Sequence, residues 1–418
     1  MIRRILIAAA AALVLGLAVC AGMYAYGVRE DASTGPAAAP ASPAERIELG
    51  RYLARAANCA ACHTAPGGQP YAGGTAIPTP FGTFYGPNIT ASAEQGIGGW
   101  SADDFWRALH NGKSRDGSLL YPAFPYTEYT RMTRADSDAI HAYLMSLPAS
   151  DAPSRPHELR TPYDQRPLLG LWRALYFRPG VQQPDDSQSE LWNRGRYLVA
   201  GPGHCAACHT PRNDWGATDA GRDLQGAVIA GLGWEATPLT GGARGLGKWS
   251  EGDIAELLRS GVSRHGSAAG PMAEVVAGST QHLSDPDLHA VAAYLKSLPE
   301  TPAAPPARQP SGTVLARGGK LYEQHCAACH QASGQGMPPA WPPLAGNPSV
   351  TAASPANVVQ MIVRGGYAPA TAQNPRPHGM PPFHTLSDGD VAALASYVRN
   401  SWGNQAGSVQ SFEVTRLR

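Results

Sequence analysis

The pentapeptide Cys-Ala-Ala-Cys-His occurs three times in the chain, at residues 59–63, 205–209 and 326–330. The spacing C-x-x-C-H is typical of covalent c-type haem attachment. Two thiols three residues apart lie on one face of a helical turn, where they can bond one porphyrin while the next histidine reaches the iron. A zinc site and a redox-active dithiol are the alternatives, and three identical copies that all end in histidine disfavour both.

Each copy therefore supplies two cysteines for attachment and one histidine as the proximal iron ligand. The predicted attachment residues are Cys59, Cys62, Cys205, Cys208, Cys326 and Cys329, and the predicted proximal ligands are His63, His209 and His330. We thus predict three covalently bound haem c groups. A haem-ligating histidine usually donates its other ring N–H to a backbone carbonyl. Residues 86–90, 237–240 and 342–344 lie at comparable places after the three motifs, and we expect the carbonyls there, although the pattern does not single one out.

The order of sequence features around each motif repeats. A helix is predicted to run into each motif, and a middle helix is predicted to end at Gly112, Gly261 or Gly365, because glycine is the usual C-cap residue. A last helix closes each repeat, at residues 133–147, 284–298 and 387–398, starting at Ser or Thr with Asp three residues on. No window alternates in the manner of a strand, so an all-α chain is expected.

Proline-rich joints separate the repeats and give the expected domain organisation. The predicted segments are 1–28 (membrane anchor or signal), 29–42 (linker), 43–150 (first haem domain), 151–186 (linker or strap), 187–300 (second haem domain), 301–311 (linker), 312–400 (third haem domain) and 401–418 (tail).

The N-terminal segment is long enough to cross a membrane. Arg3 and Arg4 precede a charge-free stretch at 5–28, and about 20 apolar residues suffice for a span. The two arginines predict a cytoplasmic N-terminus with the haem domains on the other side. An uncleaved anchor is the preferred interpretation. Removal as a signal peptide and a lipoprotein site at Cys20 remain the alternatives.

A second iron ligand is expected from later in each repeat. In the third repeat Met380 lies between the middle and last helices, and in the second Met272 occupies the same slot. Met337 resembles Met380 in its Met-Pro-Pro context but lies only seven residues after His330, on the proximal side, and is rejected. A methionine ligand raises the reduction potential, which suits an electron carrier.

The first repeat departs from this pattern, because its slot holds Phe124, which cannot bind iron. Met132 is the best candidate there, although its position just before a helix N-cap also suits a packing residue. His110, in the last turn of the middle helix, is expected to complement the helix dipole or a haem propionate. Met145 is expected in the core. An iron that is open or bound by histidine is the alternative to Met132.

Composition and missing motifs restrict the function further. Lys plus Arg is 33 and Asp plus Glu is 32, so no bulk charge indicates a nucleic-acid partner. The chain contains neither G-x-G-x-x-G after a strand nor a P-loop, and no catalytic triad or carboxylate pair stands out. We therefore expect no site that oxidises an organic substrate.

The chain resembles the membrane-bound triheme cytochrome c subunits of bacterial periplasmic dehydrogenases that act on alcohols, aldehydes, gluconate and related compounds. The three haem motifs carry the resemblance over about residues 43–403, and the stretches 120–126, 203–213, 270–276 and 402–404 sharpen it. It implies three tandem class I-like cytochrome c domains behind an N-terminal membrane helix, with Met272 and Met380 as ligands. Many members have Met at the position of Phe124, and the phenylalanine form looks more like the subunits accompanying molybdenum-dependent aldehyde and N-heterocycle oxidoreductases.

The resemblance also implies partners. These are a large dehydrogenase catalytic subunit carrying PQQ, flavin or a molybdenum cofactor, with or without a further small subunit, and ubiquinone or a terminal oxidase as acceptor. The expected role is therefore a non-catalytic electron-transfer subunit on the periplasmic side of the inner membrane. A haem enzyme working at an open first iron and a stand-alone triheme carrier are the alternatives.

Overall fold

The structure is a computed structural model that describes residues 1–35, 42–242, 244–301 and 307–418. It divides into two compact units, which are described separately. Unit 1 consists of Met1–Ala54, Cys62–Gln183 and Ala200–His204, and unit 2 consists of Arg55–Ala61, Pro184–Val199 and Cys205–Arg418.

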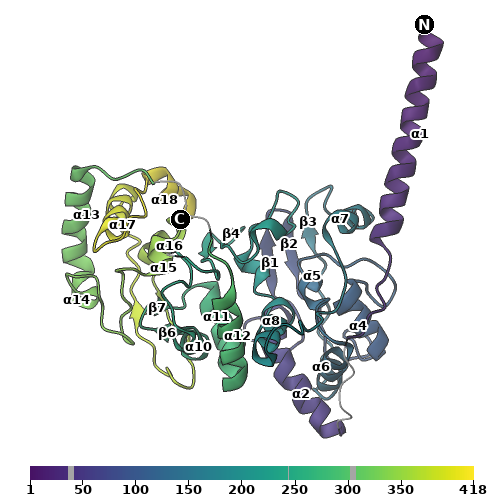
Figure 1. Cartoon of the computed structure of the whole chain (residues 1–418), viewed down its shortest axis with the longest axis horizontal. Helices are drawn as coiled ribbons and strands as arrows, with labels where there is room; N and C mark the ends of the chain where they lie inside the picture. The colour runs from purple at the N-terminus through teal and green to yellow at the C-terminus, as the bar shows by residue number, and fades with distance from the viewer. Residues whose placement is uncertain (36–41, 243, 302–306) are drawn as a thin grey trace. The chain divides into compact units, whose positions relative to one another are not determined.

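Unit 1 contains the long N-terminal helix (Figure 1) and the last two residues of the first haem motif, Cys62 and His63, whereas Cys59–Ala61 belong to unit 2. The elements of unit 1, including two helices that reach the boundary with unit 2, are α1 (Ile2–Gly27), α2 (Pro43–Ala56), α3 (Cys59–His63), β1 (Ala76–Thr79), β2 (Gly82–Tyr85), α4 (Ala102–Asn111), α5 (Tyr126–Tyr129), α6 (Arg134–Met145), β3 (Glu158–Leu159) and α7 (Leu168–Tyr176). Helix α1 extends away from the rest of the unit and is exposed along almost its whole length.

Unit 2 contains the second and third repeats. The second is built from α8 (Glu190–Ala200), α9 (Ala206–His209), η1 (Ala220–Arg222), β4 (Ala227–Ile229), β5 (Trp234–Ala236), α10 (Glu251–Ser260), β6 (Val262–Ser263), β7 (Gly266–Ser267), α11 (Pro271–Gly278), η2 (Thr280–His282) and α12 (Asp285–Ser297). The third is built from α13 (Gly312–His325), α14 (Ala327–His330), α15 (Pro348–Thr351), α16 (Ala356–Arg364), β8 (Gly366–Tyr367), β9 (Gly379–Met380), α17 (Asp388–Asn400) and α18 (Ser411–Leu417).

The same helix crossing holds each repeat together. A glycine in the first helix lies against an alanine carbonyl in the last helix, and a tyrosine four residues after the alanine covers the crossing. The sets are Gly50, Ala139 and Tyr143; Gly195, Ala290 and Tyr294; and Gly318, Ala393 and Tyr397. A Cβ atom built on these glycines would lie 1.9, 1.9 and 2.2 Å from the carbonyl oxygen, so only glycine permits the approach.

The predicted starts of the last helices and the glycines predicted to end the middle helices are confirmed, whereas the last helices end at Met145, Ser297 and Asn400, one or two residues from the predicted ends. Ser101 and Ser250 each form a capping box at the start of α4 and α10, and Gly112 and Gly261 end those helices in the left-handed conformation. Gly365 follows α16 with a positive φ of 65°. The last helices begin at the N-caps Thr133, Ser284 and Ser387, whose side chains accept a backbone N–H three residues on.

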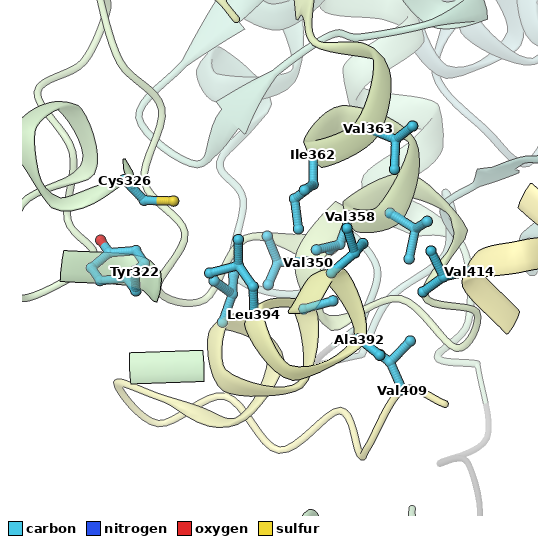
Figure 2. Close-up of a cluster of buried hydrophobic side chains, with 14 residues drawn as sticks. Tyr322, Cys326, Val350, Val358, Ile362, Val363, Ala392, Leu394, Val409 and Val414 are labelled. Carbon is cyan, nitrogen blue, oxygen red and sulfur yellow. The ribbon is translucent and has the colours of Figure 1, made fainter. Parts of the chain in front are cut away.

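Each repeat has its own hydrophobic contacts between the helices. In the third repeat, the buried cluster joins residues of α13, α16 and α17 and includes Tyr322, Cys326 and Leu394 (Figure 2). In the second repeat, Leu198 of α8, Ile254 of α10 and others pack together. The first cysteine of the third haem motif therefore borders the core of its own repeat.

Short strands supplement the helical framework, and the sequence did not predict them. The described residues contain nine strands of two to four residues, paired antiparallel, and the largest sheet has the order β1-β2-β3. A strand of this length contains too few residues to establish an alternating pattern. Glycine at the turns, such as Gly82 with φ 126°, allows the chain to reverse.

Segments expected to be linkers or a tail carry ordered structure where the structure describes them. Within 29–35, the Asp31 N–H donates to Asn111 Oδ1 at 2.9 Å. The segment 151–186 contains β3 and α7, and 401–418 contains α18, whose Val414 is buried in the cluster of the third repeat. Residues 36–41 and 302–306, which fall in the two predicted linkers, lie outside the described residues.

Candidate functional site

The three haem motifs each occupy a single helical turn. The first forms α3 (Cys59–His63), and the other two form α9 and α14 with the first cysteine, Cys205 or Cys326, as the N-cap residue. One helical turn places residues three apart on the same side, so each turn presents both thiols together. The structure thus gives all three motifs the local geometry that attachment to one porphyrin requires.

A backbone carbonyl orients each proximal histidine. Nδ1 of His63 lies 2.7 Å from the Pro87 oxygen, Nδ1 of His209 2.6 Å from the Thr237 oxygen, and Nδ1 of His330 3.0 Å from the Pro342 oxygen. A carbonyl only accepts hydrogen bonds, so Nδ1 carries the proton and Nε2 keeps its lone pair for a metal. The three stretches predicted to supply these carbonyls are confirmed, and the structure now identifies the acceptor in each.

Burial favours the neutral form of the three proximal histidines. It lowers the pKa of His63, His209 and His330, and the carbonyl acceptors oppose that effect without cancelling it. A neutral imidazole is the form that binds a metal.

Burial also favours the neutral form of the thiols, and for a thiol this means a raised pKa. Burial raises the pKa of Cys205 to about 12 and that of Cys326 to about 11, and the second thiol of each motif raises it further. Reactive dithiols have lowered pKa values, so the second and third turns do not resemble redox dithiol sites.

The donor set fits haem c. Each turn offers two thiols and an imidazole whose Nε2 is not hydrogen-bonded to any described residue. A structural zinc site needs about four His, Cys, Asp or Glu ligands. Among the described residues, no three such side chains gather in a way that could hold a metal ion. A porphyrin supplies the four nitrogen ligands that the protein does not.

Met380 is positioned by the end of the middle helix of its repeat. It lies in β9, which pairs with β8 directly after Gly365. A Cβ atom on Gly365 would lie 2.3 Å from the Met380 oxygen, so the glycine allows the two segments to approach. The Met380 side chain packs against the cluster that contains Tyr322 and Cys326. The slot predicted for a distal ligand therefore borders the hydrophobic cluster of its repeat.

Met272 lies in the first turn of α11, after Pro271, and is half-buried. The preceding Gly270 has φ 53° and a Cβ atom on it would lie 2.6 Å from the Trp234 ring, so it too allows a close approach. The rejected Met337 is 45% exposed and lies beside the proximal motif in sequence.

In the first repeat, Met132 is completely buried, immediately before the N-cap Thr133 of α6. Phe124 is half-buried, with its ring 5.6 Å from that of Tyr129. Met145 is half-buried at the end of α6. Of the two methionines, only Met132 is fully enclosed.

His110 is held by partners that the sequence did not predict. Its Nε2 lies 2.9 Å from Asp31 Oδ1 and its Nδ1 lies 3.0 Å from the Thr130 oxygen, while its ring stacks on Trp106 at 4.3 Å. The residue lies in the last turn of α4, as expected, but the sequence did not predict its pairing with Asp31, which is far away in sequence. With both ring nitrogens engaged, the side chain has no free nitrogen to offer iron.

Burial tends to raise the pKa of Asp31, but hydrogen bonds from Ser33 and His110 outweigh it, and the net effect is a lowered pKa. The sequence did not identify Asp31, because no local pattern shows that its carboxylate accepts a hydrogen bond from a histidine 79 residues later.

Comparison with known proteins agrees with these sites. A family model for cytochrome c matches residues 47–148, 193–299 and 315–402, and each match contains one of the three motifs. The cytochrome c subunit of an alcohol dehydrogenase (quinone) from Gluconobacter oxydans is 40% identical over 394 residues, covering 89% of this chain and 82% of that one. The gluconate 2-dehydrogenase cytochrome c subunit of Pantoea cypripedii is 38% identical over 406 residues, covering 89% of each chain.

A third relative is longer than this chain. It is one of the subunits of the nicotinate dehydrogenase of Pseudomonas putida, and it is 42% identical over 369 residues, which cover 85% of this chain but 30% of that protein. These findings confirm the resemblance seen in the sequence. The chain therefore belongs to the cytochrome c family, as an electron-transfer protein with three haem c sites related to the cytochrome c subunits of dehydrogenases.

Proposed function

We propose that this chain carries electrons from the catalytic subunit of a periplasmic dehydrogenase to ubiquinone or a terminal oxidase. The observation that carries the proposal is the threefold helical turn with two thiols and a histidine whose Nδ1 donates to a carbonyl. Haem c bound there supplies an iron that takes up and releases one electron. The proximal histidines of the chain would hold that iron, and the carbonyls that accept from Nδ1 would fix the orientation of each imidazole.

The distal ligands are proposed to be Met272, Met380 and Met132. Met380 has the strongest support, because it packs against the cluster that contains Cys326. Met132 is supported by its complete burial and by the engagement of both nitrogens of His110, the nearest histidine alternative. The proximal ligands are His63, His209 and His330, and the attachment residues are Cys59, Cys62, Cys205, Cys208, Cys326 and Cys329.

The chain is proposed to be three tandem class I-like cytochrome c domains, at 43–150, 187–300 and 312–400. The glycine crossing that recurs in each repeat supports this organisation. Helix α1, which is long and apolar enough to span a membrane, is proposed as an anchor in the inner membrane. Arg3 and Arg4 on its N-terminal side would remain in the cytoplasm, so that the haem domains face the periplasm.

A large dehydrogenase subunit is the proposed electron donor. Among PQQ, flavin and molybdenum cofactors we favour molybdenum for this partner. Many members of the family have Met at the position of Phe124, and the phenylalanine form looks more like the subunits that accompany molybdenum-dependent aldehyde and N-heterocycle oxidoreductases. In addition, one relative is named as a nicotinate dehydrogenase subunit.

The proposal is tested by purification from membranes in mild detergent through a C-terminal tag. We expect a large cofactor-bearing subunit to copurify, and its cofactor will define the substrate class. A lone triheme protein would contradict the proposal. Binding of carbon monoxide to the reduced first haem would then identify a haem enzyme, and its absence would identify a stand-alone carrier.

A further inference from the structure

Helix α7 exposes an apolar stripe. Leu168, Leu171, Trp172 and Leu175 follow the helical spacing i, i+3, i+4 and i+7, which places them on one face. Leu168 is 46% exposed and Leu175 53% exposed, and the two residues between them are half-exposed. The opposite face is buried in unit 1 through Leu169, Gly170, Arg173 and Ala174. A surface helix normally has polar side chains on its solvent face, so the exposed leucines of this stripe suit contact with another apolar surface.

The buried face of α7 packs against the last turn of α1. A Cβ atom on Gly27 would lie 1.8 Å from the Gly170 oxygen, and one on Gly170 would lie 2.4 Å from the Tyr24 ring. Nε of the buried Arg173 donates to the Gly27 oxygen at 2.7 Å, so it satisfies a carbonyl at the C-terminal end of α1. The two helices therefore meet backbone to backbone where α1 joins the rest of unit 1.

With α1 spanning a membrane, this junction would lie at the depth of the membrane surface. The charge-free stretch 5–28 is about 36 Å long as a helix, against a hydrocarbon core of about 30 Å, so the last turn of α1 reaches the interface. Tyr24 and Tyr26 are each 40% exposed there. Arg29 donates to Tyr26 Oη at 2.9 Å, and the guanidinium of Arg178 lies 5.8 Å from the Tyr26 ring. Tyrosine and arginine at a helix end are typical of the headgroup layer.

We propose that α7 lies in the lipid–water interface beside the end of α1, with its apolar stripe against the acyl chains. The occupant of this surface is a phospholipid bilayer, because the stripe carries no charge and continues the apolar surface of a membrane-length helix. Arg29 and Arg178 flank it at the level of the lipid phosphates. The inference rests on the proposed anchoring by α1, and it places the α7 side of unit 1 against the membrane.

Photo-crosslinking of the full chain, carrying its haems and reconstituted into nanodiscs of phosphatidylethanolamine and phosphatidylglycerol, tests the proposal. Benzoylphenylalanine is introduced in place of Leu175 or, independently, Leu168. The matched control is Leu49, which is 40% exposed and belongs to α2, a helix at the other end of unit 1 from α7 (Figure 1). Leu13 within α1, 65% exposed, reports on the anchor itself.

We expect phospholipid adducts at Leu13, Leu168 and Leu175, detected by mass spectrometry of the tryptic peptides, and at least a tenfold lower yield at Leu49. Adducts at Leu13 without adducts at either α7 position would overturn the inference and leave the anchor intact. If Leu13 also gives none, the proposed anchoring fails as well. In native membranes, crosslinks from Leu175 to another protein in place of lipid would assign the stripe to a protein interface and overturn the inference.

Discussion

The first and third repeats share a framework but differ where a distal ligand is expected. Both cross their first and last helices at a glycine, and both hold the proximal histidine through a carbonyl. The third repeat places Met380 in the ligand slot, whereas the first has Phe124 there and a buried Met132 eight residues later. The glycine at the helix crossing thus permits no larger side chain, whereas the loop predicted to supply the distal ligand varies between repeats.

The largest effect is expected from breaking the shared crossing. Gly318→Ala puts a Cβ atom 2.2 Å from the Ala393 oxygen, so α13 and α17 must separate. We expect a loss of about 3 kcal/mol in the free energy of unfolding, at the upper end of the usual range for overpacking. Gly50→Ala and Gly195→Ala should cost similar amounts in their repeats. Thermal unfolding of the haem-loaded protein measures each loss.

Gly312→Ala in the same helix α13 is the matched control, because a Cβ atom there meets nothing within 4 Å. It should leave the stability unchanged or raise it by up to about 1 kcal/mol, since alanine is the better helix former. Equal behaviour of Gly312→Ala and Gly318→Ala would refute the crossing as the common framework.

Substitutions of the predicted distal ligands test the difference between the repeats. Met380→Leu should lower the potential of one haem by on the order of 100 mV, within the ~0.8 V range over which axial ligands act. Met272→Leu should do the same for a second haem, and Met132→Leu for the third. Phe124→Leu, the control, should shift none. A redox titration followed in the haem spectra measures all four. If Met132→Leu leaves all three potentials unchanged, the first iron is open or otherwise ligated.

A smaller contrast concerns the basic side chain in the last turn of the middle helix. In the first repeat, His110 is fully buried and pairs with Asp31 at 2.9 Å, whereas in the second, Arg259 pairs with the exposed Asp285 at 2.6 Å. Asp31→Asn should lower the free energy of unfolding by about 1–2 kcal/mol, because it removes the carboxylate that accepts a hydrogen bond from the buried ring of His110. Asp285→Asn should lower the free energy of unfolding by less than about 1 kcal/mol, because exposed ion pairs contribute little. Urea unfolding of both variants gives the comparison, and equal losses would contradict it.

The smallest effect is a pH dependence specific to the second repeat. Burial tends to raise the pKa of Asp253, but hydrogen bonds from Ser250 and the Arg264 guanidinium outweigh it and lower the pKa to about 2. A folded-state pKa below the unfolded value stabilises the protein above about pH 4, and this contribution disappears as the pH falls toward about 2.

Between about pH 5 and pH 2.5 the wild type should lose about 1 kcal/mol more stability than Asp253→Asn, because the variant lacks the titrating group. Denaturant unfolding at a series of pH values measures this. Parallel pH profiles for the two proteins would show that Asp253 does not contribute in this way.

The sequence predicted the features that depend on local chemistry. The haem turns, the caps at Ser101 and Ser250, and the glycines that end α4 and α10 all follow from residues within a few positions of one another. The carbonyl acceptors were placed within short stretches for the same reason, since each comes at a comparable distance after its motif.

Features that depend on distant contacts could not be predicted. The pairing of His110 with Asp31 joins residues 79 positions apart, and Arg173 donates to a carbonyl of Gly27 146 residues earlier. Neither residue has a local pattern that specifies its partner. The short strands were not predicted for a different reason, because two to four residues are too few to show an alternation of apolar and polar side chains.

The central claim is that each of the three turns carries one covalently bound haem. Intact-mass spectrometry of the acid-denatured protein, isolated from cells that attach c-type haem, tests it most directly. The account predicts a chain with the added mass of three haems, and the loss of one haem in each of Cys59→Ala/Cys62→Ala, Cys205→Ala/Cys208→Ala and Cys326→Ala/Cys329→Ala. A wild-type chain with fewer than three haems, or a double variant that retains all three, would contradict it.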